Sequence, residues 1–168
     1  MIDKETREAA LRIFELCRER KLTLATAESC TGGLVAAAIT DIPGSSDVFD
    51  RGFVTYSNQA KQALLGVSKE TIAQHGAVSA QCAKAMAQGA MNAAGTSIAI
   101  SITGIAGPGG GSPEKPVGLV FMACANREGL FHARECRFGD IGRDEVRRRS
   151  VIAAFALIEE MLDAPKRV

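Results

Sequence analysis

The stretch 22–39 constrains the fold of this chain most, because it combines the features of a strand, a tight turn and a helix. Its first six residues favour a buried strand and its last six, all apolar, favour a buried helix. Between them, Ser29 and Cys30 precede a glycine pair that suits a tight turn. A side chain at such a bend lies beside the free N–H groups of a helix N-terminus, which favour negative charge. The stretch therefore predicts a site for a nucleophile or an oxyanion, or else a simple turn in which Ser29 or Thr31 caps the helix.

Strand-like and helix-like segments alternate along the remainder of the 168-residue chain. Between residues 57 and 95, three expected helices each begin near a serine or an asparagine and end at a glycine, and Asn58 is expected to cap the first. The expected helices lie near residues 3–20, 34–39, 58–66, 68–76, 80–94 and 143–162, and the expected strands near 22–27, 52–56, 97–103, 117–126 and 130–138. This order predicts an α/β fold: one three-layer α/β/α domain over residues 1–168, with a mixed sheet that contains a C-terminal hairpin.

Composition and charge exclude several classes of function. The formal net charge is +1, so neither nucleic acid nor an anionic membrane is an expected partner. No apolar run approaches the ~20 residues of a membrane span, and the start of the chain suits a charged helix rather than a signal peptide, so we expect a cytoplasmic protein. The five cysteines are widely spaced without a CxxC pair, and the two histidines are far apart. We therefore expect no metal, no other cofactor and no disulfide framework.

A glycine-rich loop from Gly104 to Pro116 is the one loop of functional length. It lacks the Gly-Lys-Ser/Thr of a P-loop and the GxGxxG spacing, and a strand rather than a helix follows it, so it is a weak nucleotide fingerprint. Because α/β sheets bind ligands at the carboxyl ends of their strands, the loop is expected to form a mobile wall of a pocket. Thr103 and Gly104 would then lie at the same edge of the sheet as Ser29.

Lys61 is the best candidate for a base that activates Ser29. It falls in the first turn of a short expected helix, where the positive end of the helix dipole disfavours an ammonium ion. Partial burial would lower its pKa further, towards the range in which a lysine accepts a proton. The alternative is an ordinary solvated surface lysine. Tyr56 either flanks the same pocket or serves in packing, and neither His75 nor His132 is convincingly placed as a base.

Cys30 is a rival nucleophile, because a thiolate beside a helix N-terminus has a depressed pKa and needs less activation than a serine. If Ser29 points into the cleft, however, its neighbour is expected to point elsewhere, and the sequence leaves this choice open. A second candidate group is Arg143, which begins an arginine-rich run after a glycine turn. Such a run is usually a solvated helix face, but Arg143 is the member best placed to bind a substrate phosphate.

Several motifs, in order along nearly the whole chain, closely resemble the CinA C-terminal domain family, the nicotinamide-nucleotide amidohydrolases, in its stand-alone form. They are Thr26 to Gly33, Gly52 to Asn58 with Lys61, His75 to Ser79, and Ser101 to Pro108 with Lys115 to Gly118. The resemblance implies metal-free hydrolysis of the carboxamide of nicotinamide mononucleotide, a small nucleotide, to nicotinate mononucleotide and ammonia. It implies Ser29 as nucleophile, Lys61 as general base and Tyr56 as an assisting group.

The resemblance also assigns further residues to the pocket. Ser46 and Thr103 would line and polarise it, and Arg143 would bind substrate. In the mechanism that we expect to follow, backbone N–H groups of Cys30, Thr31 and Gly32, or of Thr103 and Gly104, would stabilise the oxyanion. Two alternatives remain open, namely the same amidase chemistry with Cys30 as nucleophile, and a nucleotide-binding domain without turnover. The alanine-rich helix expected over 80–94 can pack on the sheet or on a second subunit, so a homodimer or a higher homo-oligomer is also expected.

Overall fold

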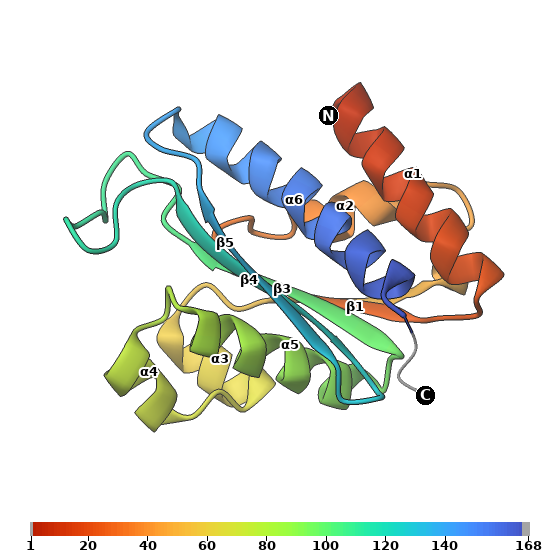
Figure 1. Ribbon diagram of the computed structural model, residues 1–168, viewed down its shortest axis with the longest axis horizontal. Helices are drawn as coiled ribbons and strands as arrows, with labels where there is room; N and C mark the ends of the chain where they lie inside the picture. The colour runs from red at the N-terminus through yellow and green to blue at the C-terminus, as the bar shows by residue number, and fades with distance from the viewer. Residues whose placement is uncertain (1, 166–168) are drawn as a thin grey trace.

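The computed structural model describes residues 2–165, in which a five-stranded sheet lies between two layers of helices (Figure 1). The strands are β1 (Leu24–Glu28), β2 (Phe49–Val54), β3 (Ile98–Gly104), β4 (Leu119–Asn126) and β5 (Phe131–Arg137). The helices are α1 (Lys4–Glu19), α2 (Leu34–Thr40), α3 (Asn58–Leu65), α4 (Lys69–His75), α5 (Ala80–Ala94) and α6 (Arg143–Asp163), with a 3-10 turn η1 (Ser45–Asp47). Helices α1, α2 and α6 cover one face, and α3, α4 and α5 lie on the other (Figure 1). The predicted α/β/α layering is confirmed.

The strand order is β2-β1-β3-β4-β5, with β1 at the point where the chain changes direction across the sheet. Strand β1 is parallel to both β2 and β3, whereas β4 is antiparallel to β3 and to β5. The chain leaves β1 through α2 on one face to reach β2, and returns through α3, α4 and α5 on the other face to reach β3. Ligands of α/β proteins bind at such a switch point, outside the carboxyl ends of the strands. The carboxyl ends of β1 and β3 are therefore the place to look for a site.

The alanine-rich helix α5 packs on the sheet and against α3. Its inward face is Cys82, Ala83, Met86, Ala87, Ala90 and Met91, all buried in the core on this side of the sheet. Gly89 allows α3 to approach closely, because a Cβ atom there would lie 1.9 Å from the carbonyl oxygen of Leu65. Of the two packing partners expected for this helix, the structure shows the sheet, and the homo-oligomer stays a prediction.

Most of the expected helix caps are observed, with one correction. Asp3, Ser68 and Ser79 each accept a hydrogen bond from a backbone N–H of the helix that follows, as their positions in the sequence predict. The prediction that Asn58 caps α3 is wrong, because the Ser57 hydroxyl accepts the N–H of Ala60 at 3.0 Å. Asn58 is instead the first residue inside α3, three residues before Lys61.

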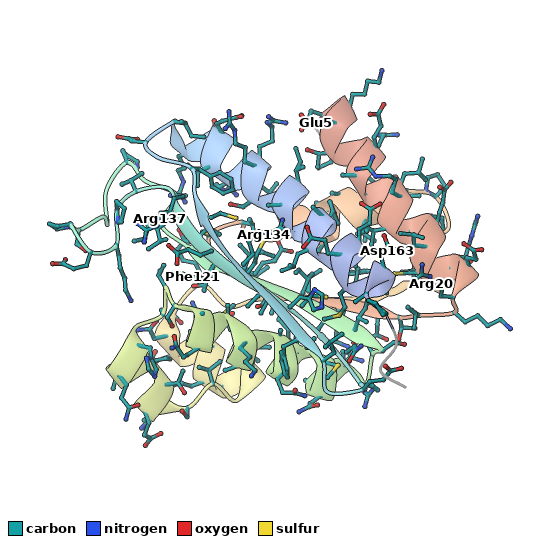
Figure 2. The ribbon with its side chains drawn as sticks, viewed as in Figure 1. Glu5, Arg20, Phe121, Arg134, Arg137 and Asp163 are labelled. Atoms are coloured by element: carbon teal, nitrogen blue, oxygen red, sulfur yellow. The ribbon has the colours of Figure 1, made fainter. Side chains whose placement is uncertain are left out.

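Ion pairs between α1 and α6 tie together the helices of one layer. Arg20 pairs with Asp163 at 3.5 Å and Glu5 pairs with Arg148 at 2.9 Å, and Figure 2 shows Glu5 at one end of this helix pair, with Arg20 and Asp163 at the other. Such solvent-exposed pairs typically contribute less than about 1 kcal/mol each. The layer therefore depends mainly on its apolar core. Within residues 2–165, no helix has both the length and the apolar character needed to cross a membrane.

Candidate active site

Ser29 lies at the carboxyl end of β1 and points to the α3 side of the sheet. Its N–H donates to the carbonyl of Ile102 at 3.0 Å, so the pairing of β1 with β3 continues to this residue. Side chains alternate along a strand, and Glu28 accordingly faces α2 while Ser29 reaches Lys61 on α3. The serine side chain is largely buried, with 8% of its surface exposed.

The N-terminus of α2 is capped by Glu28, a residue that the sequence interpretation missed. The buried carboxylate accepts the N–H groups of Val35 at 2.8 Å and Ala36 at 3.0 Å. The expectation that Ser29 or Thr31 caps this helix is therefore wrong. The same contacts correct the expectation of free donors at the end of α2, because Glu28 already supplies the negative charge that the helix dipole favours.

Lys61 is almost completely buried, with 2% of its surface exposed, and its amine meets the serine. Its Nζ atom donates to Ser29 Oγ at 3.1 Å and to the carbonyl oxygen of Thr55 at 2.9 Å. Burial lowers the pKa of Lys61 from its ordinary value of 10.5 and outweighs the nearby cysteines Cys82 and Cys30, which act in the opposite direction. The alternative of a solvated surface lysine is wrong.

A protonated Lys61 would have no carboxylate in the described part of the chain to balance its charge, and this favours the neutral amine. Among the ion pairs of residues 2–165, none joins Lys61 to a carboxylate. An isolated buried ammonium is costly, so such a group tends to lose its proton. A neutral amine keeps two N–H donors and gains a lone pair. With one N–H directed to the Thr55 carbonyl, the lone pair is available to accept the proton of Ser29.

A pocket of about 220 Å³ opens above this pair at the carboxyl ends of β1 and β3. Its walls are Ser29, Cys30, Tyr56, Asn58, Lys61, Ala77, Val78, Thr103, Gly104, Ala106 and Arg143. The structure thus brings together seven of the ten residues that the sequence assigned to a site. Ala106 comes from the glycine-rich loop, so this loop contributes to the wall as expected.

Arg143 and Tyr56 form the exposed rim of the pocket. The Arg143 guanidinium donates to the Tyr56 hydroxyl at 3.1 Å and to the carbonyl of Gly107 at 2.9 Å. Tyr56 itself is 62% exposed. The start of α6, the segment between β2 and α3, and the glycine-rich loop are therefore joined at the mouth of the site. On the inner wall, the Thr103 hydroxyl donates to the carbonyl of Ala77 at 2.9 Å.

Three predicted site residues do not line the pocket, and Ser46 is the clearest correction. Ser46 lies in η1, directly before β2, at the end of the sheet where the carbonyl of Val48 accepts the N–H of Leu24. This is the amino end of β1, whereas the pocket is at its carboxyl end. Thr31 and Gly32 belong to the turn beneath the pocket. The Thr31 side chain is fully buried, and its hydroxyl has no hydrogen-bond partner within residues 2–165.

The structure argues against the thiol of Cys30 as nucleophile. The Cys30 side chain packs in the apolar core on the α2 and α6 side of the sheet, away from the face that carries Ser29. Burial raises the pKa of the Cys30 thiol to about 12. The expectation of a depressed pKa is therefore wrong, because desolvation outweighs the effect of the nearby helix N-terminus.

Two further residues of the site were missed in the sequence. Asn58 was interpreted as a helix cap, although it lies in the same run as Tyr56 and Lys61 and lines the pocket. Arg147 was included in a solvated helix face, but its guanidinium contacts the carbonyls of Cys30 and Thr31. The position of Arg147, one helical turn after Arg143, was the available signal, since residues four apart share a helix face.

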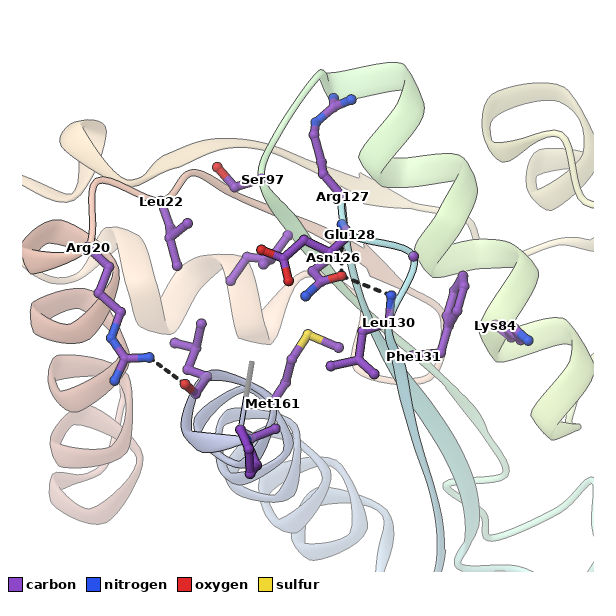
Figure 3. Close-up of a pocket in the computed structure, with 15 residues that line it drawn as sticks. Arg20, Leu22, Lys84, Ser97, Asn126, Arg127, Glu128, Leu130, Phe131 and Met161 are labelled. Atoms are coloured by element: carbon purple, nitrogen blue, oxygen red, sulfur yellow. Dashed lines mark hydrogen bonds between the residues drawn. The ribbon is translucent and has the colours of Figure 1, made fainter. Parts of the chain in front are cut away.

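A larger pocket of about 960 Å³ lies at the opposite end of the sheet, beside the β4–β5 turn and the end of α6 (Figure 3). Two of its arginines and its asparagine are already bound to other parts of the chain. Arg20 donates to the carbonyl of Leu162, Arg127 donates to that of Thr96, and the Asn126 side chain accepts the N–H of Leu130. No described side chain of this pocket is a buried amine without a carboxylate partner, as Lys61 is in the smaller pocket.

Together, the mixed sheet between two layers of helices and the serine–lysine pair buried at its switch point define an α/β domain with a candidate site at the carboxyl ends of its central strands. The chain belongs to the CinA C-terminal domain family, which matches residues 6–162. This confirms the resemblance carried by the sequence motifs.

Individual relatives agree with this membership. The chain is 52% identical to "Nicotinamide-nucleotide amidohydrolase PncC" of Escherichia coli K12, over 94% of this chain and 93% of that protein. Its fold matches the crystal structure of the competence/damage inducible protein CihA of Agrobacterium tumefaciens with a TM-score of 0.94, at 49% identity and over 98% and 99% of the two chains. The chain spans 38% and 39% of two longer relatives, from Caldanaerobacter subterraneus and Symbiobacterium thermophilum, each 48% identical to it.

Proposed function

We propose that this protein is an amidohydrolase that converts nicotinamide mononucleotide and water to nicotinate mononucleotide and ammonia. The observation that carries the proposal is the 3.1 Å contact between Ser29 Oγ and the buried amine of Lys61, whose pKa is lowered. A serine and a neutral lysine in contact form a nucleophile and its base without a metal. The name of the Escherichia coli relative supplies the substrate, a nicotinamide nucleotide.

In the acylation step, neutral Lys61 accepts the proton of the Ser29 hydroxyl while the Oγ atom attacks the carboxamide carbon. The carbonyl π electrons move to oxygen and give a tetrahedral oxyanion. When this intermediate collapses, the carbon–nitrogen bond breaks and Lys61 returns its proton to the nitrogen, which leaves as ammonia. The product of this step is an ester between nicotinate and Ser29, with Lys61 neutral again.

In the deacylation step, Lys61 accepts a proton from a water molecule as the water oxygen attacks the ester. The second tetrahedral intermediate expels Ser29 Oγ, which regains its proton from Lys61 and leaves the nicotinate carboxyl group as product. The positive pyridinium ring of the substrate supports both steps. It withdraws electrons from the carbonyl and disfavours a protonated Lys61 nearby.

The remaining pocket residues have supporting roles in this proposal. The N–H groups of Cys30 and Thr31 are the candidate oxyanion donors, because the N–H of Gly32 is already bound to the carbonyl of Ser29. One oxyanion donor typically contributes about 3 kcal/mol to catalysis. The pocket of about 220 Å³ is smaller than a typical ligand site, so the nicotinamide end of the substrate would enter it and leave the phosphate outside. Arg143 at the rim is the candidate phosphate ligand.

The second candidate function is nucleotide binding without turnover. It is favoured only if Lys61 remains protonated, since an ammonium 3.1 Å from Ser29 cannot accept a proton. The buried environment and the lack of a carboxylate partner within residues 2–165 argue against that state. Release of ammonia distinguishes the two functions directly.

The test is to incubate the purified protein with nicotinamide mononucleotide and to measure ammonia and nicotinate mononucleotide together. We expect the two products in equal amounts. Nicotinamide riboside is the matched control substrate, because it keeps the carboxamide and the positive pyridinium ring but has no phosphate for Arg143. Tight binding of the nucleotide without ammonia release would contradict the proposal and establish the binding function instead.

A further inference from the structure

We infer that Arg147 is a positioning residue that holds the turn carrying Ser29 in its active conformation. The inference rests on the proposed function, because it concerns the same serine. Arg147 extends from α6 towards the turn, where its Nε donates to the carbonyl of Cys30 at 3.1 Å and its Nη2 to that of Thr31 at 3.3 Å. The turn is closed by the N–H of Gly32, which donates to the carbonyl of Ser29 at 3.0 Å.

The two contacts fix the central peptide group of this turn. A four-residue turn has two common forms that differ mainly by a flip of the peptide between its second and third residues, here Cys30 and Thr31. The bond from Arg147 holds the Cys30 carbonyl on the α6 side. In the flipped form, the Thr31 N–H would face the guanidinium instead, and two donors would oppose each other. Arg147 therefore selects one form.

The selected form determines where the turn presents its donors. The C=O and N–H of a trans peptide point in opposite directions. With the Cys30 carbonyl held towards Arg147, the Thr31 N–H must point away from α6. The next peptide is held from both sides, since its carbonyl accepts from Arg147 and its N–H, that of Gly32, donates to Ser29. The arginine thus orients the candidate oxyanion donors without touching the substrate.

The charge environment of Arg147 differs from that of its neighbours. Arg148 and Arg149 both donate to the carboxylate of Glu145, whereas no ion pair of residues 2–165 includes Arg147. Its guanidinium is partly buried and lies close to the turn, since a Cβ atom on Gly32 would be 3.4 Å from Nη2. The described contacts of this arginine are therefore with the turn, and not with the surface charge network.

The test compares Arg147→Gln and Arg147→Lys with the matched control Arg149→Gln, which removes an arginine from the same helix. We expect Arg147→Gln to lower kcat for nicotinamide mononucleotide about 100-fold with KM within about threefold, because small misplacements of catalytic groups have effects of that order. Arg147→Lys keeps the charge but cannot bridge both carbonyls, so we expect about a tenfold loss. Arg149→Gln should keep kcat within about twofold.

A second measurement follows the turn itself and does not depend on activity. Amide NMR spectra should show changed Cys30, Thr31 and Gly32 resonances in Arg147→Gln, while Arg149→Gln leaves them in place. If the wild-type protein releases no ammonia, the proposed function fails, and these resonances alone decide the inference. Unchanged resonances, or an unchanged kcat in an active enzyme, would overturn it. If Arg147→Gln does not fold, Arg147→Lys provides the same comparison.

Discussion

The two ends of the sheet contrast in how they treat their polar groups. The amino end has the larger pocket, about 960 Å³, and its arginines and amide are bound to backbone groups of the same chain. The carboxyl end has a pocket of about 220 Å³, with a buried lysine that lacks a carboxylate partner within residues 2–165. Volume is therefore a poor guide to chemistry in this molecule. A buried amine held against a hydroxyl is the more informative feature, because the fold must bear the cost of desolvating it.

The largest expected effect at the carboxyl end is that of Ser29→Ala. Without the nucleophile, ammonia release should fall at least about 10⁴-fold. The comparison variant is Cys30→Ala, which we expect to keep kcat within about tenfold, because the thiol packs in the core. Mass spectrometry of protein trapped during turnover should locate the acyl group on Ser29. An acyl group on Cys30 would instead revive the cysteine mechanism.

Lys61→Met should remove the catalytic base but increase the stability of the folded protein. We expect about a 10³-fold loss of kcat, which is within the range for general-base catalysis. Since burial lowers the pKa of Lys61, the unfolded chain binds the proton more tightly, and below pH 10.5 this linkage opposes folding. A methionine of similar length should therefore raise the free energy of unfolding by about 1 kcal/mol near pH 7. Denaturant unfolding measures this change, and a clear loss of stability would contradict the account.

The pH dependence of the wild-type enzyme tests directly whether the pKa of Lys61 is lowered. The rate should increase about tenfold per pH unit below the lowered pKa of Lys61 and become constant well below pH 10.5. The free energy of unfolding should also increase with pH between the lowered pKa and 10.5, because over this range the unfolded chain still binds the proton that the folded protein has released. A kcat/KM profile that continues to rise up to pH 10.5 would show that Lys61 has an ordinary pKa.

Gly89→Ala tests how closely α3 must approach α5 for Lys61 to reach Ser29. A Cβ atom at position 89 would lie 1.9 Å from the carbonyl of Leu65, so α3 must move away from α5. We expect a loss of about 2 kcal/mol in stability, less than the steric effect alone because alanine is the better helix former. The kcat value should fall about tenfold with it. Equal stability and activity would mean that α3 can shift without disturbing the pair.

The smallest effect should come from the amino end. Lys84 lines the larger pocket and lies over the Phe131 ring, with Nζ 4.5 Å from the ring centre. Lys84→Gln should lower the free energy of unfolding by about 0.5 kcal/mol through the lost cation–π contact and leave kcat/KM within about twofold. A large loss of activity would show that the two ends of the sheet are coupled, which would break the contrast.

Local sequence signals predicted most of the fold. Apolar periodicity predicted the strands, and short polar caps with glycine stops predicted the helices, because both depend on residues close together in the chain. The errors in the helix caps concern which of several nearby polar side chains supplies the cap. Glu28 caps α2 from the preceding strand, and Ser57 rather than Asn58 caps α3, a choice between adjacent residues that propensity alone cannot make.

The site shows the same division between local and distant information. Ser29, Lys61, Tyr56 and Thr103 were predicted from motifs, and the structure brings them to one pocket. Ser46 was carried over with them but lies at the other end of the sheet. The difference is one of strand direction: Ser29, Tyr56 and Thr103 lie at or after the carboxyl ends of parallel strands, whereas Ser46 precedes β2.

By itself, the sequence determined which segments become strands and helices, and through its motifs it determined the family. Only the tertiary structure decided that Lys61 is buried against Ser29, that Cys30 faces the opposite core with a raised pKa, and that Arg147 reaches the turn. The physical reason is that secondary structure follows mainly from neighbouring residues. Burial, and with it the pKa of an amine or a thiol, depends on groups brought together from distant parts of the chain.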